Sequence, residues 1–137
     1  MIVEPGSARA VLILEDNDIE REGMAAVLRQ AGYATLPAPS VDVALAYPES
    51  TGTCPDLILL DMMLRDKDGW RFLELRKKNP ALASVPVVIV TGLGVASQEW
   101  GTSLGASAVL KKPFDSADLL RKVRKHCPEA RNETLPI

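Results

Sequence analysis

Three short runs of hydrophobic residues, at positions 11–14, 57–60 and 87–90, contain no alternating polar residues. Uninterrupted apolar runs of this length, rich in branched side chains, are typical of parallel β-strands that helices cover on both faces. Two weaker runs, at positions 33–36 and 108–110, predict further strands. The pattern therefore predicts five short strands, of which the three strongest are buried on both faces.

Between the strands, apolar residues recur at a spacing of three or four, which predicts five amphipathic helices. The expected limits are Gly32 after the first helix, Ser40 before the second, residues 70–78 for the third, residues 96–104 with Gly105 for the fourth, and Asp115 at the start of the fifth. The residues expected to face the sheet are Ile19, Gly23, Val27 and Leu28 in the first helix, Val41, Ala44 and Leu45 in the second, Phe72, Leu73 and the stem of Arg76 in the third, and Leu119, Leu120 and Val123 in the fifth.

Five strands that alternate with five helices on short connections predict an α/β domain with a mainly parallel sheet and right-handed crossovers. The chain has 137 residues, about the length of one domain and enough to bury a core without disulfides or structural metal. We therefore expect one domain over residues 8–127, followed by a flexible tail over residues 128–137.

The composition argues against several classes of protein. Cys54 and Cys127 are far apart and belong to no cluster of metal-ligating residues, so neither a zinc module nor a disulfide framework is expected. This cysteine usage favours a reducing, cytoplasmic location. The apolar runs are too short to cross a bilayer, and Glu15 and Asp16 directly after the first run argue against a signal peptide.

The net charge of −2 is too small to attract nucleic acid over the whole surface, so direct nucleic-acid binding is not expected. The charge is unevenly distributed. Residues 1–68 contain 12 acidic and 5 basic residues, whereas residues 69–137 contain 6 acidic and 11 basic residues. The acidic half must face water, pair with the basic half or hold a cation.

Polar side chains follow four of the five predicted strands. Glu15 and Asp16 come after the first strand, Asp61 after the third, Thr91 after the fourth and Lys112 after the fifth. The carboxyl ends of parallel strands form one edge of a sheet, and open α/β sheets bind their ligands there. We therefore expect these side chains to converge.

Three carboxylates at one edge repel each other, and Lys112 cancels only one of their charges. The remaining charge of about −2 fits a divalent cation. The oxygens are too few to enclose the ion, so it keeps water and open positions, which suits Mg²⁺ better than Ca²⁺. Because Mg²⁺ beside a lysine and a hydroxyl can hold a phosphoryl group, Asp61 is the candidate nucleophile.

Five motifs, in this order, resemble the receiver domain of two-component response regulators. They are Leu14-Glu15-Asp16-Asn17, Leu60-Asp61-Met62-Met63-Leu64 followed by Asp68-Gly69, Thr91-Gly92, Leu104-Gly105-Ala106 and Lys112-Pro113-Phe114. The resemblance covers about residues 10–125. It implies a flavodoxin-like, doubly wound (βα)5 fold with strand order 2-1-3-4-5, and a phosphoaspartate switch supplied by a histidine kinase or a histidine phosphotransfer protein.

The resemblance gives the acidic residues two roles. Asp61 is the expected phosphoacceptor. Asp16 is expected to bind Mg²⁺, with help from Glu15 through water. Asp61 and the backbone carbonyl of Met63 complete the expected ligand set.

The resemblance also implies roles for two residues at the ends of the last strands. Thr91 is expected to hydrogen-bond one phosphoryl oxygen and Lys112 to pair with another. The Lys112–Pro113 peptide bond is expected to be cis, as in the family. His126 lies after the last predicted helix and is not placed to phosphorylate Asp61, so the donor is expected to be another molecule.

Two positions depart from the family pattern. Arg65 stands where the family usually has proline after the acceptor, so the loop after Asp61 is expected to be less rigid. Val109 stands where an aromatic residue on the fifth strand usually turns inward with the threonine. Any output change is therefore expected to be small or to use another route.

Two alternatives stay open, and one further similarity is rejected. The departures at Arg65 and Val109 favour a pseudo-receiver, an interaction module that binds partners without phosphate. An aspartate-nucleophile phosphohydrolase would need an acid two residues after the nucleophile, where this chain has Met63. Residues 92–97 are similar to a dinucleotide-binding glycine motif, but Ser97 replaces its third glycine.

The residues and the resemblance together predict a signalling domain rather than an enzyme that turns over a substrate. Its expected partners are a phosphohistidine donor and a downstream partner or output domain that the sequence does not identify. A homodimer is compatible with the sequence.

Overall fold

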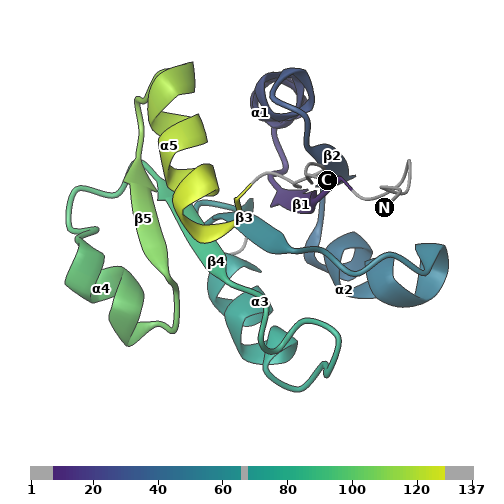
Figure 1. The fold of residues 1–137 in the computed structure, drawn as a ribbon. Helices are drawn as coiled ribbons and strands as arrows, with labels where there is room; N and C mark the ends of the chain where they lie inside the picture. Colours follow the sequence, from purple (N-terminus) through teal and green to yellow (C-terminus); the bar gives the residue numbers. More distant parts are fainter. Residues whose placement is uncertain (1–7, 66–67, 129–137) are drawn as a thin grey trace.

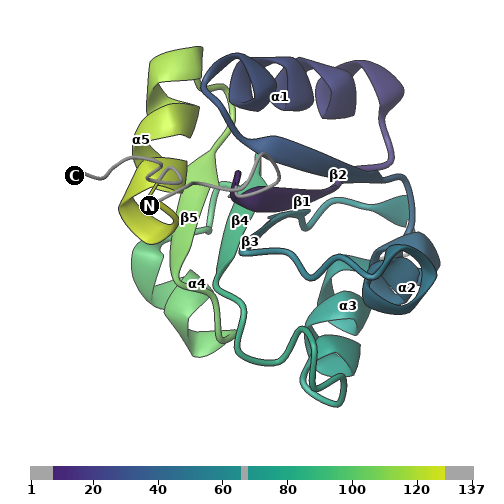
Figure 2. The ribbon, with the colours of Figure 1, turned by 45° about the vertical axis from the view of Figure 1, so that its right-hand side comes forward.

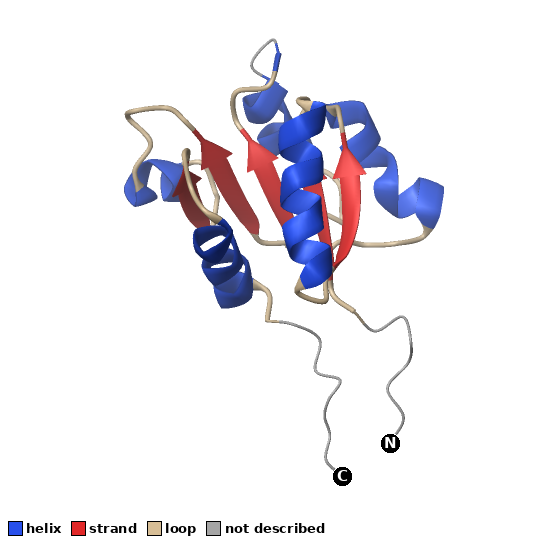
Figure 3. Ribbon diagram, turned by 90° about the horizontal axis from the view of Figure 1, so that it is seen from above, coloured by secondary structure: helices blue, strands red, loops and turns tan. Residues whose placement is uncertain are grey.

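The computed structural model describes residues 8–65 and 68–128. Within these residues, five parallel strands form one sheet in the order β2-β1-β3-β4-β5 (Figure 3). The strands are β1 (Ala10–Leu14), β2 (Ala34–Ala38), β3 (Leu57–Asp61), β4 (Val87–Thr91) and β5 (Ala108–Lys111). The predicted flavodoxin-like α/β fold with strand order 2-1-3-4-5 is confirmed. The predicted tail lies outside the described residues from residue 129 onward.

Helices cover both faces of the sheet (Figure 1, Figure 2). One face carries α1 (Asp18–Gln30) and α5 (Ser116–His126), and the other carries α2 (Val41–Thr51), α3 (Asp68–Arg76) and α4 (Gln98–Ser103). None of the helices in the described part of the chain has the length and apolar character that crossing a bilayer requires. Cys54 and Cys127 are both free, as the sequence predicts.

The three strongest strands are buried on both faces because their side chains alternate between two cores. Leu12 and Leu14 of β1 belong to the core beneath α2, α3 and α4, whereas Val11 and Ile13 belong to the core beneath α1 and α5. All four are 0% exposed. Burial of one such side chain stabilises the fold by about 1.5–3 kcal/mol, so the sheet holds its carboxyl edge firmly in place.

Polar side chains fix where four helices begin. The N-cap residues Asn17, Ser40, Ser97 and Asp115 each accept a hydrogen bond from a backbone N–H of the first turn. Asp115 also forms a capping box with Asp118. The predicted helix starts after Ser40 and at Asp115 are therefore confirmed.

The predicted buried stripe of the first helix is confirmed at Leu28 and in part at Val27, but it is wrong at Ile19 and Gly23. Ile19 is 84% exposed and Gly23 is exposed, whereas Met24, Ala25 and Leu28 face the core. Ile19 belongs to the first turn of α1, which starts at the carboxyl edge of the sheet, so little of the sheet lies beneath it. A hydrophobic residue there could not be distinguished from a core residue by spacing alone.

Three smaller expectations also differ. β2 continues through Pro37, which is tolerated because β2 is an edge strand. Helix α4 is shorter than expected because Ser97 caps it, and Leu120 is only partly buried. In α3, by contrast, Phe72, Leu73 and Arg76 are buried as expected, and Arg76 donates a hydrogen bond to the carbonyl of Val85 at 2.7 Å.

Gly101 brings α4 close to β5. A Cβ atom at position 101 would clash with Cγ2 of Val109, because the two carbon atoms would be closer than they can approach without strain. Val109 is 8% exposed and packs in the core beneath α4. The glycine and the small branched residue therefore fit each other, and a larger side chain at position 109 would require α4 to move outward.

We expect Gly101→Ala to lower the free energy of unfolding by about 1–2 kcal/mol, because Val109 is stiff and cannot easily turn away from the new methyl group. In a chain that also carries Val109→Ala, the same change should be neutral or stabilise by up to about 1 kcal/mol, since alanine is the better helix former. Chemical denaturation measures both values. Gly23→Ala in α1 is the control and should also stabilise, because a Cβ there meets nothing within 4 Å. Equal destabilisation in both Val109 backgrounds would contradict the contact.

Candidate functional site

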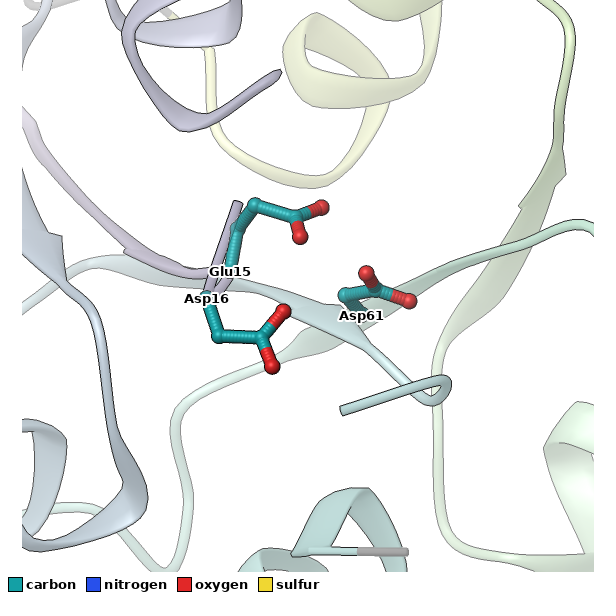
Figure 4. Close-up of side chains that lie close together, drawn as sticks. All are labelled: Glu15, Asp16 and Asp61. Atoms are coloured by element: carbon teal, nitrogen blue, oxygen red, sulfur yellow. The ribbon is translucent and has the colours of Figure 1, made fainter. Parts of the chain in front are cut away.

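Three carboxylates lie together at the carboxyl edge of the sheet (Figure 4). Glu15 and Asp16 follow β1 directly, and Asp61 is the last residue of β3. β1 and β3 pair with Leu14 opposite Leu60, so the next residues along the two strands are neighbours. Each acid offers one oxygen, and these oxygens all lie within 4.8 Å of one another. The strand order thus brings the three predicted acids together.

The ammonium group of Lys112 lies among these acids. Its Nζ atom is 3.4 Å from Oε1 of Glu15, 3.4 Å from Oδ2 of Asp61 and 2.5 Å from Oε1 of Glu20. The Lys112–Pro113 peptide bond is cis, as the resemblance implies. Lys112 therefore joins the ends of β1 and β3 to the first turn of α1.

Burial and charge shift the protonation of two of these groups. Glu15 is 1% exposed, and its burial, together with a hydrogen bond to Asp61 and the charge of Asp61, raises the pKa of Glu15 to about 7. Burial alone would lower the pKa of Lys112, but the hydrogen bond to Glu20 and the charges of Asp61 and Glu15 raise it to about 12. Lys112 is therefore charged at neutral pH. Glu15 changes between its protonated and its charged form near the same pH.

Met63 contacts the candidate acceptor Asp61, and Thr91 ends the neighbouring strand β4. The backbone N–H of Met63 donates to Oδ1 of Asp61 at 2.8 Å, while the Met63 side chain is 55% exposed. Thr91 is 0% exposed at the end of β4, the strand beside β3, and its hydroxyl accepts a hydrogen bond from the N–H of Leu93 at 3.1 Å. Because that oxygen already accepts, the hydroxyl proton is left to donate to a ligand.

The two residues that depart from the family pattern lie in different places. The backbone N–H of Arg65 donates to Oδ2 of Asp16 at 3.2 Å, so Arg65 belongs to the site. Val109 lies in the core beneath Gly101 of α4 and contributes no polar group.

Glu20 is a site residue that the strand-end pattern does not reveal. It lies in the first turn of α1, and its carboxylate reaches Lys112. An acid in a first turn is usually explained by the helix dipole, so the position alone carries no information about a site. The available signal was that α1 begins directly after Glu15 and Asp16, which places its first turn at the same edge of the sheet.

The donor atoms fit a small, hard cation. All three acids supply oxygen, which is the ligand that Mg²⁺ prefers, and three residues leave room for the waters that Mg²⁺ usually keeps. The side chain of Asp16 is 26% exposed, so the cluster is open to solvent on that side. The site can thus hold a hydrated divalent ion beside a lysine.

Comparison with known proteins agrees with this geometry. A sequence profile of the response regulator receiver domain matches residues 11–124. The phosphate regulon transcriptional regulatory protein PhoB of Klebsiella pneumoniae is 33% identical over 118 residues, which are 85% of this chain and 51% of PhoB. The chain thus spans about half the length of PhoB. Protein PilG of Pseudomonas aeruginosa is 28% identical over 119 residues, which are 86% of this chain and 87% of PilG.

Solved structures share the whole fold. Chemotaxis protein CheY4 of Vibrio cholerae has a TM-score of 0.76 at 25% identity, over 86% of this chain and 98% of CheY4. A putative response regulator from Chloroflexus aurantiacus has a TM-score of 0.75 at 29% identity, over 85% of this chain and 95% of that protein. With the profile match over most of its length, the chain belongs to the receiver domain family of two-component response regulators.

Proposed function

We propose that this receiver domain accepts a phosphoryl group on Asp61 from the phosphohistidine of a partner protein, with Mg²⁺ bound at the acidic cluster. The observation that supports it best is the meeting of Glu15, Asp16 and Asp61 around one point, with Lys112 facing the same atoms. An ordinary surface turn would not bring these residues together, because buried carboxylates repel one another unless a cation lies between them.

Asp61 acts as the nucleophile. The N–H of Met63 holds Oδ1, and Lys112 faces Oδ2, so both oxygens of the carboxylate are oriented. One of them attacks phosphorus: a P–O bond forms, the P–N bond to histidine breaks, and the imidazole leaves with the electron pair. Water later attacks the same phosphorus, which releases inorganic phosphate and restores the Asp61 carboxylate.

The other site residues stabilise the charge of the phosphoryl group. Lys112 pairs with one phosphoryl oxygen, and the hydroxyl of Thr91 donates to another. Asp16 and Asp61 hold the Mg²⁺ ion, with Glu15 acting through water and the carbonyl of Met63 completing the ligand set. When bound, the ion compensates the negative charge of the phosphoryl oxygens.

The phosphoryl donor is a histidine of another protein. His126 is the single histidine in the sequence, and it ends α5, which starts beside Lys112 at the site and runs back along the sheet to its other edge. The proposed donor is a histidine kinase or a histidine phosphotransfer protein in the cytoplasm. The result is a signal to a downstream partner or output domain rather than turnover of a substrate.

The test is phosphorylation in solution. Incubation with acetyl phosphate and Mg²⁺ should add one adduct of about 80 Da, visible by intact mass spectrometry. Asp61→Asn should remove the adduct, because the amide cannot form an acyl phosphate. Asp42→Asn should leave it intact, since Asp42 is an exposed acid on α2, outside the carboxylate cluster.

Three outcomes would overturn the proposal. An unmodified wild-type chain would favour the pseudo-receiver, and an equal adduct on Asp61→Asn would place the phosphoryl group elsewhere. Steady release of phosphate from small phosphate esters would instead favour a phosphohydrolase. We expect no such turnover, because Met63 stands where that class needs an acid.

A further inference from the structure

Arg65 joins two loops that are far apart in the sequence. Its backbone N–H donates to Oδ2 of Asp16, 49 positions earlier, at 3.2 Å. The preceding residue, Leu64, is 6% exposed and packs in the core, which anchors the backbone that carries this N–H. The contact therefore ties the loop after β3 to the loop after β1, and it ends on one of the three acids of the cluster.

The backbone N–H of Arg65 orients the Asp16 carboxylate. A hydrogen bond to one oxygen restricts rotation of the group and leaves Oδ1 without a contact from Arg65. Figure 4 shows one oxygen of Asp16 turned toward Asp61 and Glu15. Proline, the residue that the family usually has at this position, has no N–H and could not make this bond.

The charged side chain of Arg65 approaches the same oxygen of Asp16 that accepts the hydrogen bond from the Arg65 N–H. Its Nε atom lies 3.8 Å from Oδ2 of Asp16, and the side chain is 90% exposed. Asp16 is 26% exposed, whereas Glu15 and Asp61 are 1% and 4% exposed, so an ion from solvent meets the cluster first at Asp16. At that point the guanidinium already supplies a positive charge.

We propose that Arg65 sets the affinity of the cluster for Mg²⁺ in two opposing ways. Its N–H positions Asp16 for the ion, and its guanidinium competes with the ion for the same carboxylate. Arg65 is thus a positioning residue that determines how much Mg²⁺ the domain needs before Asp61 can be phosphorylated. This inference rests on the proposed function, because it concerns the metal that this function uses.

Two substitutions separate the two effects. Arg65→Ala removes the guanidinium and keeps the N–H, and it should tighten Mg²⁺ binding about 2–5-fold, the size expected for an exposed ion pair. Arg65→Pro removes both, and it should bind Mg²⁺ about 5–10-fold more weakly than Arg65→Ala. Isothermal titration of the full chain with MgCl₂ measures all three constants without any phosphorylation step.

Ionic strength and a second arginine control for general charge effects. The gain in Arg65→Ala should shrink between low and high salt, because exposed charges are screened. Arg71→Ala removes the same charge from α3, where Arg71 pairs with Asp42 and Asp68, and it should leave the Mg²⁺ constant unchanged. Tightening in Arg71→Ala equal to that in Arg65→Ala would reduce the effect to net charge and overturn the guanidinium part of the proposal.

The remaining outcomes distinguish a failure of the proposed function from a failure of this inference. A wild-type chain that binds no Mg²⁺ contradicts the proposed function itself, whereas equal constants for the wild type and both Arg65 variants contradict only this inference. If Arg65→Pro does not fold, amide hydrogen exchange replaces it. The Arg65 N–H should be protected in the wild type and exchange several-fold faster in Asp16→Ala, and equal exchange rates would overturn the positioning part.

Discussion

Lys112→Ala is expected to lower the free energy of unfolding of the metal-free domain by about 2–4 kcal/mol. Removing one partner of a buried ion pair leaves an uncompensated charge, which costs about 3–5 kcal/mol when both partners are fully buried. Here Glu15 and Asp61 are 1% and 4% exposed, but Lys112 itself is 27% exposed, so we expect a value below the top of that range. Chemical denaturation in EDTA at pH 8 measures it.

Two further chains test the cause of that loss. Lys111→Ala is the control, because Lys111 is exposed and, among the described residues, its Nζ atom donates to a backbone carbonyl, that of Gly94, and to no acid. It should change stability by less than about 0.5 kcal/mol. Adding Glu15→Gln to Lys112→Ala should restore part of the loss, since it removes one of the two buried charges. An equal loss in Lys111→Ala, or no recovery in the double variant, would show that the acids are not the cause.

The central strands were predictable from sequence because they are buried on both faces. Residues 57–60 and 87–90 are all apolar, and a short continuous apolar run between turns is typical of a strand buried on both faces. The edge strand β2 was located less accurately, since it is partly exposed and contains Pro37, which normally marks the end of a strand. Helix α1 was placed correctly, and Leu28 faces the core as predicted. Ile19 and Gly23 do not, because Ile19 lies in the exposed first turn and Gly23 has no side chain to bury.

The positions of Asp61, Thr91 and Lys112 at one edge could be predicted because each lies at the end of a strand. A parallel sheet brings all such positions to one edge, whatever the details of packing. Glu20 could not be found this way, since its role depends on the direction in which a helical side chain points. The contact of Arg65 with Asp16 could not be predicted either. A backbone N–H makes this contact, and every residue type except proline has one.

Glu15→Gln is expected to stabilise the metal-free domain increasingly as the pH rises from about 4.5 to about 7. The folded chain keeps a proton on Glu15 up to a pKa of about 7, whereas the unfolded chain releases it at the ordinary glutamate pKa of 4.5. Between these values the folded state binds more protons, so the stability of the wild type falls with increasing pH. Glutamine has the same shape and no charge, and it escapes this loss, which is on the order of 3 kcal/mol above pH 7.

The measurement is the difference in unfolding free energy between Glu15→Gln and the wild type, taken in EDTA from pH 4 to pH 8. The difference removes the contributions of all other carboxylates, and it should be near zero below pH 4.5 and level off above pH 7. Glu74→Gln, on the exposed face of α3, is the control for replacing a glutamate that is not buried, and it should change the stability little. Saturating Mg²⁺ should reverse the sign at pH 8, because the ion binds the folded wild type more tightly than a variant that has lost a carboxylate. A difference that does not depend on pH would show that Glu15 ionises in the folded chain as it does in the unfolded one.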